Sequence, residues 1–148
     1  MAKRVTVRTR QGTRYVADIN TGRHTIVADE PKTEGGDDAG PTPRELLLAA
    51  IGSCTTMTIQ IYAEMKGWPL TGVEVQLDYE KHIDKKPEGG ATAWESIDQR
   101  IVLHGDLTPE QRERLLHTAA KCPIHRTVAE GATFSETLVE TLDGDAIS

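Results

Sequence analysis

The longest apolar segment of the chain lies at residues 40–70, and its pattern predicts a single long helix. The apolar side chains of this segment do not follow one stripe, but cover most of the helical circumference. They belong to Leu46, Leu47, Leu48, Ala49, Ala50, Ile51, Met57, Ile59 and Ile61. A helix that is apolar on nearly all sides is typical of a buried position, so we expect the other elements to pack around it.

Both ends of this helix carry residues that start and stop helices. Thr42 is a suitable N-cap, Pro43 fits the first helical position, and Glu45 completes a capping-box pattern with Thr42. Gly67 and Pro69 predict the C-terminal end. About 24 residues at a rise of 1.5 Å span roughly 36 Å, which is about the width of a small domain.

The residues before the helix predict three short strands. Apolar and polar residues alternate at 5–10, 15–19 and 24–28, and glycine-containing turns separate the three segments. A polar, glycine-rich loop at 29–39 then leads into the helix.

Two further strands are expected after the helix, at 73–79 and 97–103, because apolar residues again alternate with polar ones. The segment between them, residues 81–95, contains proline and a glycine pair and predicts a long mobile loop. We expect Trp94 to anchor the base of this loop.

A second helix start follows at Thr108, with Pro109 at the first helical position and Gln111 closing a capping box. This helix should extend to about residue 121. Its inward face is predicted to consist of Leu115, Ala119 and Cys122.

Cys122 and Pro123 predict another helix start, with Cys122 as the N-cap of a short helix that ends near Gly131. Residues 133–142 then predict a final strand, and residues 143–148 are expected to fray.

The predicted order is β-β-β-α-β-β-α-α-β, which indicates an α+β fold with a largely antiparallel, six-stranded sheet around one buried helix. The chain has 148 residues, which is enough for a single domain (residues 1–148) with its own core. One sheet and a short helix pair do not have enough surface to bury a helix that is apolar on all sides. We therefore expect a homodimer in which the partner subunit covers the remainder.

Composition narrows the classes of partner. The net charge is −6 and no dense basic patch occurs, which argues against a nucleic-acid or acidic-membrane partner. The longest strictly apolar run, residues 46–51, is too short to cross a bilayer, and residues 1–4 do not precede an apolar signal segment. We therefore expect a cytoplasmic protein. No phosphate-binding glycine loop and no serine-hydrolase motif occurs.

Cys54 and Cys122 are the main candidates for chemistry, although free cysteines are also among the residue types most often buried as small hydrophobes. An N-cap position would favour the thiolate of Cys122, because it faces free N–H groups and the positive end of a helix dipole. Arg126, one turn further on, would add positive charge. Cys54 receives no such help from its own helix. A zinc site formed by both cysteines and His125 is a weaker alternative, because it offers only three of the usual four ligands.

Other polar residues are weaker candidates. His24, His82, His104 and His117 are isolated in sequence. Glu45 lies nine residues before Cys54, which places it on the opposite face of the helix and roughly 13 Å away along its axis. Within one chain we therefore interpret Glu45 first as a cap.

The segments GPTPRELLLAAIGSC at 40–54 and KCPIHR at 121–126 resemble the OsmC/Ohr family of osmotically inducible and organic hydroperoxide resistance proteins, and the likeness covers nearly the whole chain. The resemblance implies an intertwined homodimer with its active site at the subunit interface. It implies a thiol-dependent peroxidase that reduces organic hydroperoxides, in which Cys54 attacks and Cys122 resolves. An external dithiol would reopen the resulting disulfide, and no cofactor is implied.

Peroxidases of this family pair an activating arginine with the glutamate of an Asn-Pro-Glu motif. The position that matches this glutamate is Arg44, and Glu45 is the next residue. Candidates for activating the thiolate or positioning the substrate are Glu45, Arg126 and His24, and also Arg14 and Arg23. The departure at Arg44 keeps open a second function: a catalytically quiet protein of the same fold that binds an apolar, lipid-like molecule at the dimer interface.

Overall fold

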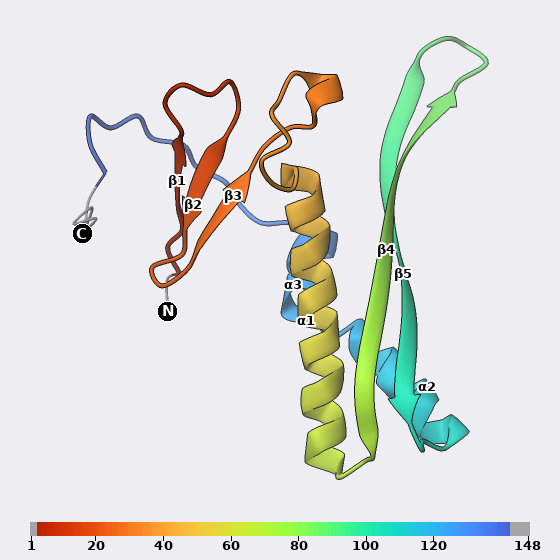
Figure 1. The fold of residues 1–148 in the computed structure, drawn as a ribbon. Coiled ribbons are helices and arrows are strands. Elements are labelled where there is room, and N and C mark those ends of the chain that lie inside the picture. Colours follow the sequence, from red (N-terminus) through yellow and green to blue (C-terminus); the bar gives the residue numbers. More distant parts are fainter. Residues whose placement is uncertain (1–2, 143–148) are drawn as a thin grey trace.

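A computed structural model describes residues 3–142 and shows an α+β arrangement (Figure 1). The three predicted N-terminal strands are present and form an antiparallel sheet in the order β1-β2-β3. They are β1 (Thr6–Thr9), β2 (Ala17–Asn20) and β3 (Thr25–Ala28). Val7 pairs with Ile19, and Ile19 pairs with Ile26, so the alternation seen in the sequence becomes an apolar row across the sheet.

The loop between this sheet and the long helix is organised by Asp29 and contains the short 3-10 helix η1 (Lys32–Glu34). The carboxylate of Asp29 is buried and accepts the backbone N–H groups of Glu30, Asp37 and Ala39 at 2.8, 3.0 and 3.1 Å. These bonds, led by the one from Ala39, lower the pKa of Asp29 against the opposing effect of burial. The polar loop is therefore a fixed connection rather than a loose one.

The predicted long helix is confirmed as α1 (Pro43–Lys66). Thr42 is its N-cap, and the Thr42 hydroxyl accepts the backbone N–H of Glu45 at 3.2 Å. Gly67 ends the helix in the left-handed conformation. The reciprocal bond of a capping box, from Glu45 back to Thr42, is not among the hydrogen bonds of residues 3–142, so this half of the predicted box does not form.

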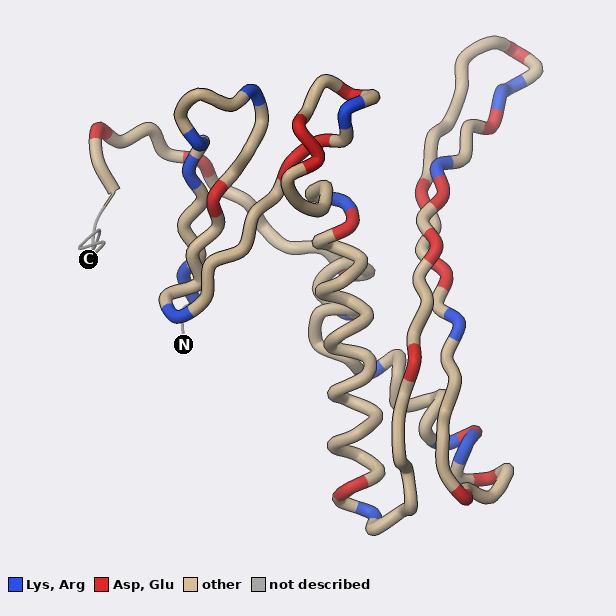
Figure 2. Tube along the Cα trace, viewed as in Figure 1, with Lys and Arg blue, Asp and Glu red and all other residues tan. Residues whose placement is uncertain are grey.

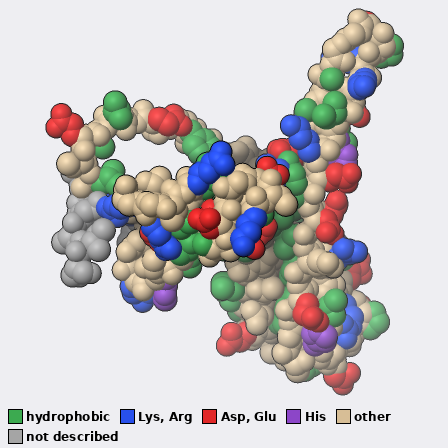
Figure 3. Space-filling model, turned by 45° about the horizontal axis from the view of Figure 1, so that its top comes forward, with side chains coloured by type: hydrophobic (Ala, Val, Ile, Leu, Met, Phe, Trp, Pro, Cys, Tyr) green, Lys and Arg blue, Asp and Glu red, His purple; other side chains and the backbone are tan. Residues whose placement is uncertain are grey.

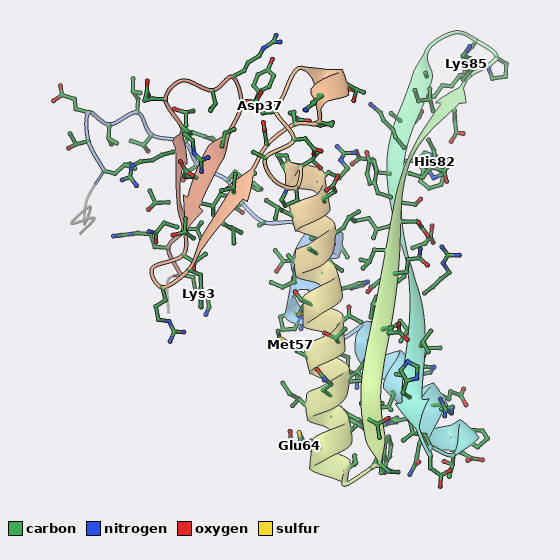
Figure 4. All side chains as sticks on the ribbon, viewed as in Figure 1. Lys3, Asp37, Met57, Glu64, His82 and Lys85 are labelled. Atoms are coloured by element: carbon green, nitrogen blue, oxygen red, sulfur yellow. A yellow bond between two sulfur atoms is a disulfide. The ribbon has the colours of Figure 1, made fainter. Side chains whose placement is uncertain are left out.

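The prediction that α1 is buried on nearly all sides is wrong for a single chain. Only one face is buried, and it carries Ile51, Thr55, Ile59 and Ala63 at helical spacing. On the opposite side Met65 is 76% exposed, and Met57 and Glu64 project away from β4 (Figure 4). Charged residues lie only at the two ends of the helix (Figure 2). Between these two ends the outer face of α1 carries no charged residue, and it is exposed in the single chain.

By length and composition α1 is the one helix of the described residues that could cross a membrane, and core helices of soluble proteins pass the same test. Its buried face packs as a core helix does, against the strand β4 (Leu70–Lys85) and the helices α2 (Pro109–Ala119) and α3 (Pro123–Glu130). The central cluster of this packing consists of Ile59, Ala63, Leu107, Leu115 and Ala119.

The predicted mobile loop at 81–95 is instead part of a long antiparallel arm, formed by β4 and β5 (Ala91–Gly105). The arm extends past the N-terminal end of α1 and stands out from the rest of the molecule (Figures 1 and 3). Trp94 does not anchor the base of a loop. Its ring stacks on His82 from the opposite strand at 3.8 Å, and its Nε1–H donates to Asp84 at 2.8 Å. Cross-strand pairs of this kind stabilise the two strands far beyond the apolar segments.

The two predicted C-terminal helices are confirmed as α2 and α3. The side chain of Thr108 accepts from Gln111, and the Gln111 side chain accepts from Thr108, so this capping box is complete. The predicted inward face is also confirmed, since Leu115, Ala119 and Cys122 are all buried.

The predicted final strand at 133–142 does not form. Within residues 3–142 the expected six-stranded sheet is replaced by one sheet of three strands and one of two. Residues 133–142 alternate as a strand does, but a strand requires a neighbour with which to exchange backbone hydrogen bonds. Leu138 in this segment is 100% exposed. The expected fraying at 143–148 lies outside the described residues.

Candidate active site

Cys54 and Cys122 are joined by a disulfide, with their Cα atoms 5.9 Å apart. Cys54 lies in the middle of α1, and Cys122 lies at the junction of α2 and α3. The two residues are 68 positions apart in sequence, and they meet because the inward face of α2 packs against α1. The Cα separation falls within the range of about 4.4–6.8 Å that disulfides require.

The environments of the two sulfur atoms differ. Cys122 has 0% exposure and is the N-cap of α3, as predicted. Its Sγ accepts the backbone N–H of His125 at 3.4 Å and faces the positive end of the α3 dipole. Cys54 is half-buried, and its Sγ lies 4.0 Å from the hydroxyl of Thr58.

A cavity of about 470 Å³ lies between α1, α3 and the β4–β5 arm. Its wall includes Ile51, one helical turn before Cys54, and His125, three residues after Cys122. The other lining residues are Arg44, Leu47, Tyr79, Glu95, Ile97, Gln99, Val128 and Ala129. Next to Cys54, Thr55 donates a hydrogen bond to Gln99 at 2.9 Å, which ties this part of α1 to β5. Both cysteine-bearing elements therefore contribute to one largely apolar cavity.

The far end of the cavity is polar. The guanidinium of Arg44 lies over the ring of Tyr79 at 3.8 Å, and its Nη1 lies 4.0 Å from Oε1 of Glu95. The hydroxyl of Tyr79 donates to Glu95, and this hydrogen bond is the main cause of the raised pKa of Tyr79. Arg44 is ten residues before Cys54, or roughly 15 Å along the helix axis. The backbone of Arg44 therefore lies at the N-terminal end of α1, whereas Cys54 lies in the middle of the helix.

The structure brings the two cysteines together but places the other predicted site residues elsewhere. Glu45 is exposed at the start of α1. Arg126 is exposed on α3, where its Nε lies 3.6 Å from Glu130. His24 is exposed in the turn before β3. None of these three lines the cavity within the chain.

The sequence interpretation missed Tyr79, Glu95 and the position of Arg44 in the cavity. The sequence pattern places Glu95 in a mobile loop, and only the register of β4 against β5 brings it near Tyr79. His125 was considered only as a zinc ligand. Across residues 3–142, no three His, Cys, Asp or Glu side chains are grouped so that they could hold a metal ion.

Residues 35–137 match the family described as OsmC-like protein. No curated protein matches the sequence. Several solved structures have a similar fold, each at 19–20% identity over 86% of this chain. A putative osmotic stress induced and detoxification response protein from Psychrobacter arcticus has a TM-score of 0.65 over 88% of its chain.

Two further matches are described as organic hydroperoxide resistance proteins. The protein from Legionella pneumophila has a TM-score of 0.56 over 89% of its chain. The protein from Vibrio cholerae, a putative member of this class with captopril in one of its active sites, has a TM-score of 0.58 over 85% of its chain. At these identities the likeness shows a shared fold.

Proposed function

The chain belongs to the OsmC-like family, and on this premise we propose that it is a thiol-dependent peroxidase that reduces organic hydroperoxides through Cys54 and Cys122. Its role would be defence against oxidative stress, in the cytoplasm. The observation that carries the proposal is the disulfide between the two cysteines, which do not themselves line the cavity but lie three residues from its lining residues Ile51 and His125. A cysteine pair in a cytoplasmic protein is more often redox-active than structural.

The proposed cycle needs only the two thiols and an external dithiol. The thiolate of Cys54 attacks the terminal oxygen of the hydroperoxide, the O–O bond breaks, and the alkoxide leaves and takes up a proton. Cys54 becomes a sulfenic acid. The thiol of Cys122 then attacks the sulfur of Cys54, and water leaves as the disulfide forms. The external dithiol returns both cysteines to the reduced state by exchange.

The cavity supports an organic hydroperoxide as the substrate rather than hydrogen peroxide. Leu47, Ile51 and Ile97 give it apolar walls, and about 470 Å³ is in the usual size range of small-molecule sites. Hydrogen peroxide has no apolar surface to bury against such walls. An alkyl chain would bury its apolar surface there, out of contact with water, which favours binding.

A homodimer is part of the proposal. The exposed Met57, Ile61 and Met65 form an apolar strip on the outer face of α1, and residues 133–142 carry exposed apolar side chains without strand partners. A second copy of the chain would cover both features. The partner could also supply the cation that activates Cys54, since Arg14, Arg23 and His24 lie away from the cavity within one chain.

A binding protein without catalysis is the second candidate. It is favoured by Arg44, which stands where peroxidases of the family carry glutamate and which interacts with Tyr79 and Glu95 at the far end of the cavity. In this case the apolar cavity would hold a lipid-like molecule, and the cysteines would have no part in turnover.

The two cysteine variants test the assignment of roles. In Cys122→Ser, limiting cumene hydroperoxide should leave Cys54 as a sulfenic acid that a dimedone-type reagent traps, because no second thiol can condense with it. Cys54→Ser should lose consumption of the hydroperoxide. The opposite pattern would reverse the roles, and undiminished consumption in both variants would exclude the proposed cycle.

A further inference from the structure

The disulfide between Cys54 and Cys122 is asymmetric in exposure. Cys122 has no exposed surface, whereas Cys54 is half-buried. A partner subunit can only cover more of the chain, so Cys122 remains closed to solvent in any assembly of this conformation. An attacking thiolate must approach one sulfur in line with the S–S bond, and access helps to decide which sulfur is attacked. Approach to Cys122 is blocked by the packing of α1, α2 and α3.

The two sulfurs also differ as leaving groups. The Sγ of Cys122 accepts the N–H of His125 at 3.4 Å and caps the eight-residue helix α3. An N–H donor and a helix N-terminus both stabilise negative charge on sulfur. Cys54, in the middle of α1, has the hydroxyl of Thr58 at 4.0 Å. A thiol that is more stable as thiolate leaves faster in disulfide exchange.

From these two asymmetries we infer that reduction of the disulfide is directional: the external dithiol attacks Sγ of Cys54, and Cys122 departs as the thiolate. The S–S bond between the cysteines breaks, its electron pair moves to Sγ of Cys122, and a mixed disulfide forms between Cys54 and the reductant. The second thiol of the reductant then loses its proton and attacks the reductant's own sulfur in the mixed disulfide. This step closes an intramolecular disulfide in the reductant and releases Cys54 as a thiolate.

This inference rests on the proposed redox cycle, but it gives the N-cap of α3 a separate task. The N-cap position of Cys122 favours its thiolate, although the family resemblance makes Cys54 the nucleophile toward peroxide. Both hold if the N-cap acts in the reductive half of the cycle, where Cys122 is the leaving group. His125 is then a positioning residue that acts through its backbone N–H on Cys122.

The direction of attack can be measured on the whole protein without any peroxide. The disulfide is formed with diamide, treated briefly with 2-mercaptoethanol and quenched with acid, and the liberated thiol is capped with N-ethylmaleimide. Tryptic peptides that contain residues 45–66 and 122–126 then report which cysteine carries mercaptoethanol. We expect mercaptoethanol mainly on Cys54 and maleimide mainly on Cys122. Mercaptoethanol mainly on Cys122, or equally on both, would overturn the inference.

The same reaction in denaturant is the control, since both sulfurs are then accessible and the preference should disappear. Persistence of the preference in denaturant would also contradict the inference, because it would come from local sequence rather than from the fold. A protein that shows this preference but consumes no hydroperoxide would refute the proposed function and leave the direction of opening intact.

A matched pair of variants tests the backbone N–H. His125→Pro removes both the N–H and the imidazole, whereas His125→Ala removes only the imidazole. We expect reductive opening to slow by roughly five- to tenfold in His125→Pro and to stay near the wild-type rate in His125→Ala. Equal rates in both variants would contradict the role of the N–H. The measurement of direction on the wild type stands even if His125→Pro does not fold.

Discussion

At the scale of single residues, backbone N–H groups hold the side chains of Cys122 and Asp29, and a cross-strand contact joins Tyr79 to Glu95. Cys122 followed by Pro123 is a helix start that depends only on neighbouring residues, and the N-cap is present in the structure. Tyr79 and Glu95 are sixteen positions apart, and their contact depends on the register in which β4 and β5 pair, which no local pattern fixes. The role of Asp29 could not be predicted either. Its carboxylate accepts three backbone N–H groups of a loop whose sequence indicates only that it is polar.

Asp29→Asn should lower the midpoint of thermal unfolding at neutral pH, because an amide replaces a buried carboxylate that accepts three N–H bonds. The folded state lowers the pKa of Asp29, so its ionised form stabilises the protein above the ordinary pKa of aspartate. This contribution is lost as the pH falls through the lowered pKa. The difference in melting temperature between wild type and variant should therefore shrink on acidification. Asp37→Asn, at an exposed position, is the control, and a difference that is constant with pH would contradict the account.

At the scale of elements, the helices were predictable and the strands only in part. The three α-helices of residues 3–142 each begin with an N-cap followed by proline, a signal that lies within a few residues. The outer half of the β4–β5 arm was missed because its residues are mostly polar and are held by cross-strand pairs such as His82 with Trp94. Residues 133–142 have a strand pattern but find no strand partner among the residues that the structure describes, so the pattern alone is not sufficient.

Glu45→Gln should change the free energy of unfolding by less than about 0.5 kcal/mol, since the side chain is exposed and the bond at the start of α1 uses the backbone N–H of residue 45. Chemical denaturation of both proteins measures this. If the side chain takes part in catalysis through the partner chain, the same variant will keep its stability and lose turnover. A marked loss of stability would contradict the assignment of Glu45 as an exposed residue whose side chain takes no part in the cap.

At the scale of the whole molecule, the apolar circumference of α1 predicts that the helix is buried on all sides, and one chain buries only part of it. The structure covers one face and leaves Met57, Ile61 and Met65 exposed. Solved structures at 19–20% identity share the arrangement of elements with this chain. Under the proposed function, a partner subunit would supply the part of the site that one chain lacks.

Ile61→Glu should dissociate the proposed dimer, because it would bury an unpaired charge in the interface. Sedimentation at micromolar concentration should show a dimer for the wild type and a monomer for the variant. Leu116→Glu places the same charge on the exposed surface of α2 and should leave the dimer intact. A wild-type protein that sediments as a stable folded monomer would exclude the dimer and with it the completion of the site by a partner.

The most direct test of the account is a count of free thiols in the wild-type protein during titration with cumene hydroperoxide. The account predicts that one equivalent of hydroperoxide consumes both thiols of a chain and leaves one intramolecular disulfide between Cys54 and Cys122, with one equivalent of cumyl alcohol formed. Hydrogen peroxide should act more slowly at the same concentration, because it gains nothing from the apolar cavity. Wild-type protein that keeps both thiols free under excess cumene hydroperoxide would contradict the peroxidase and leave the binding protein as the function of this fold.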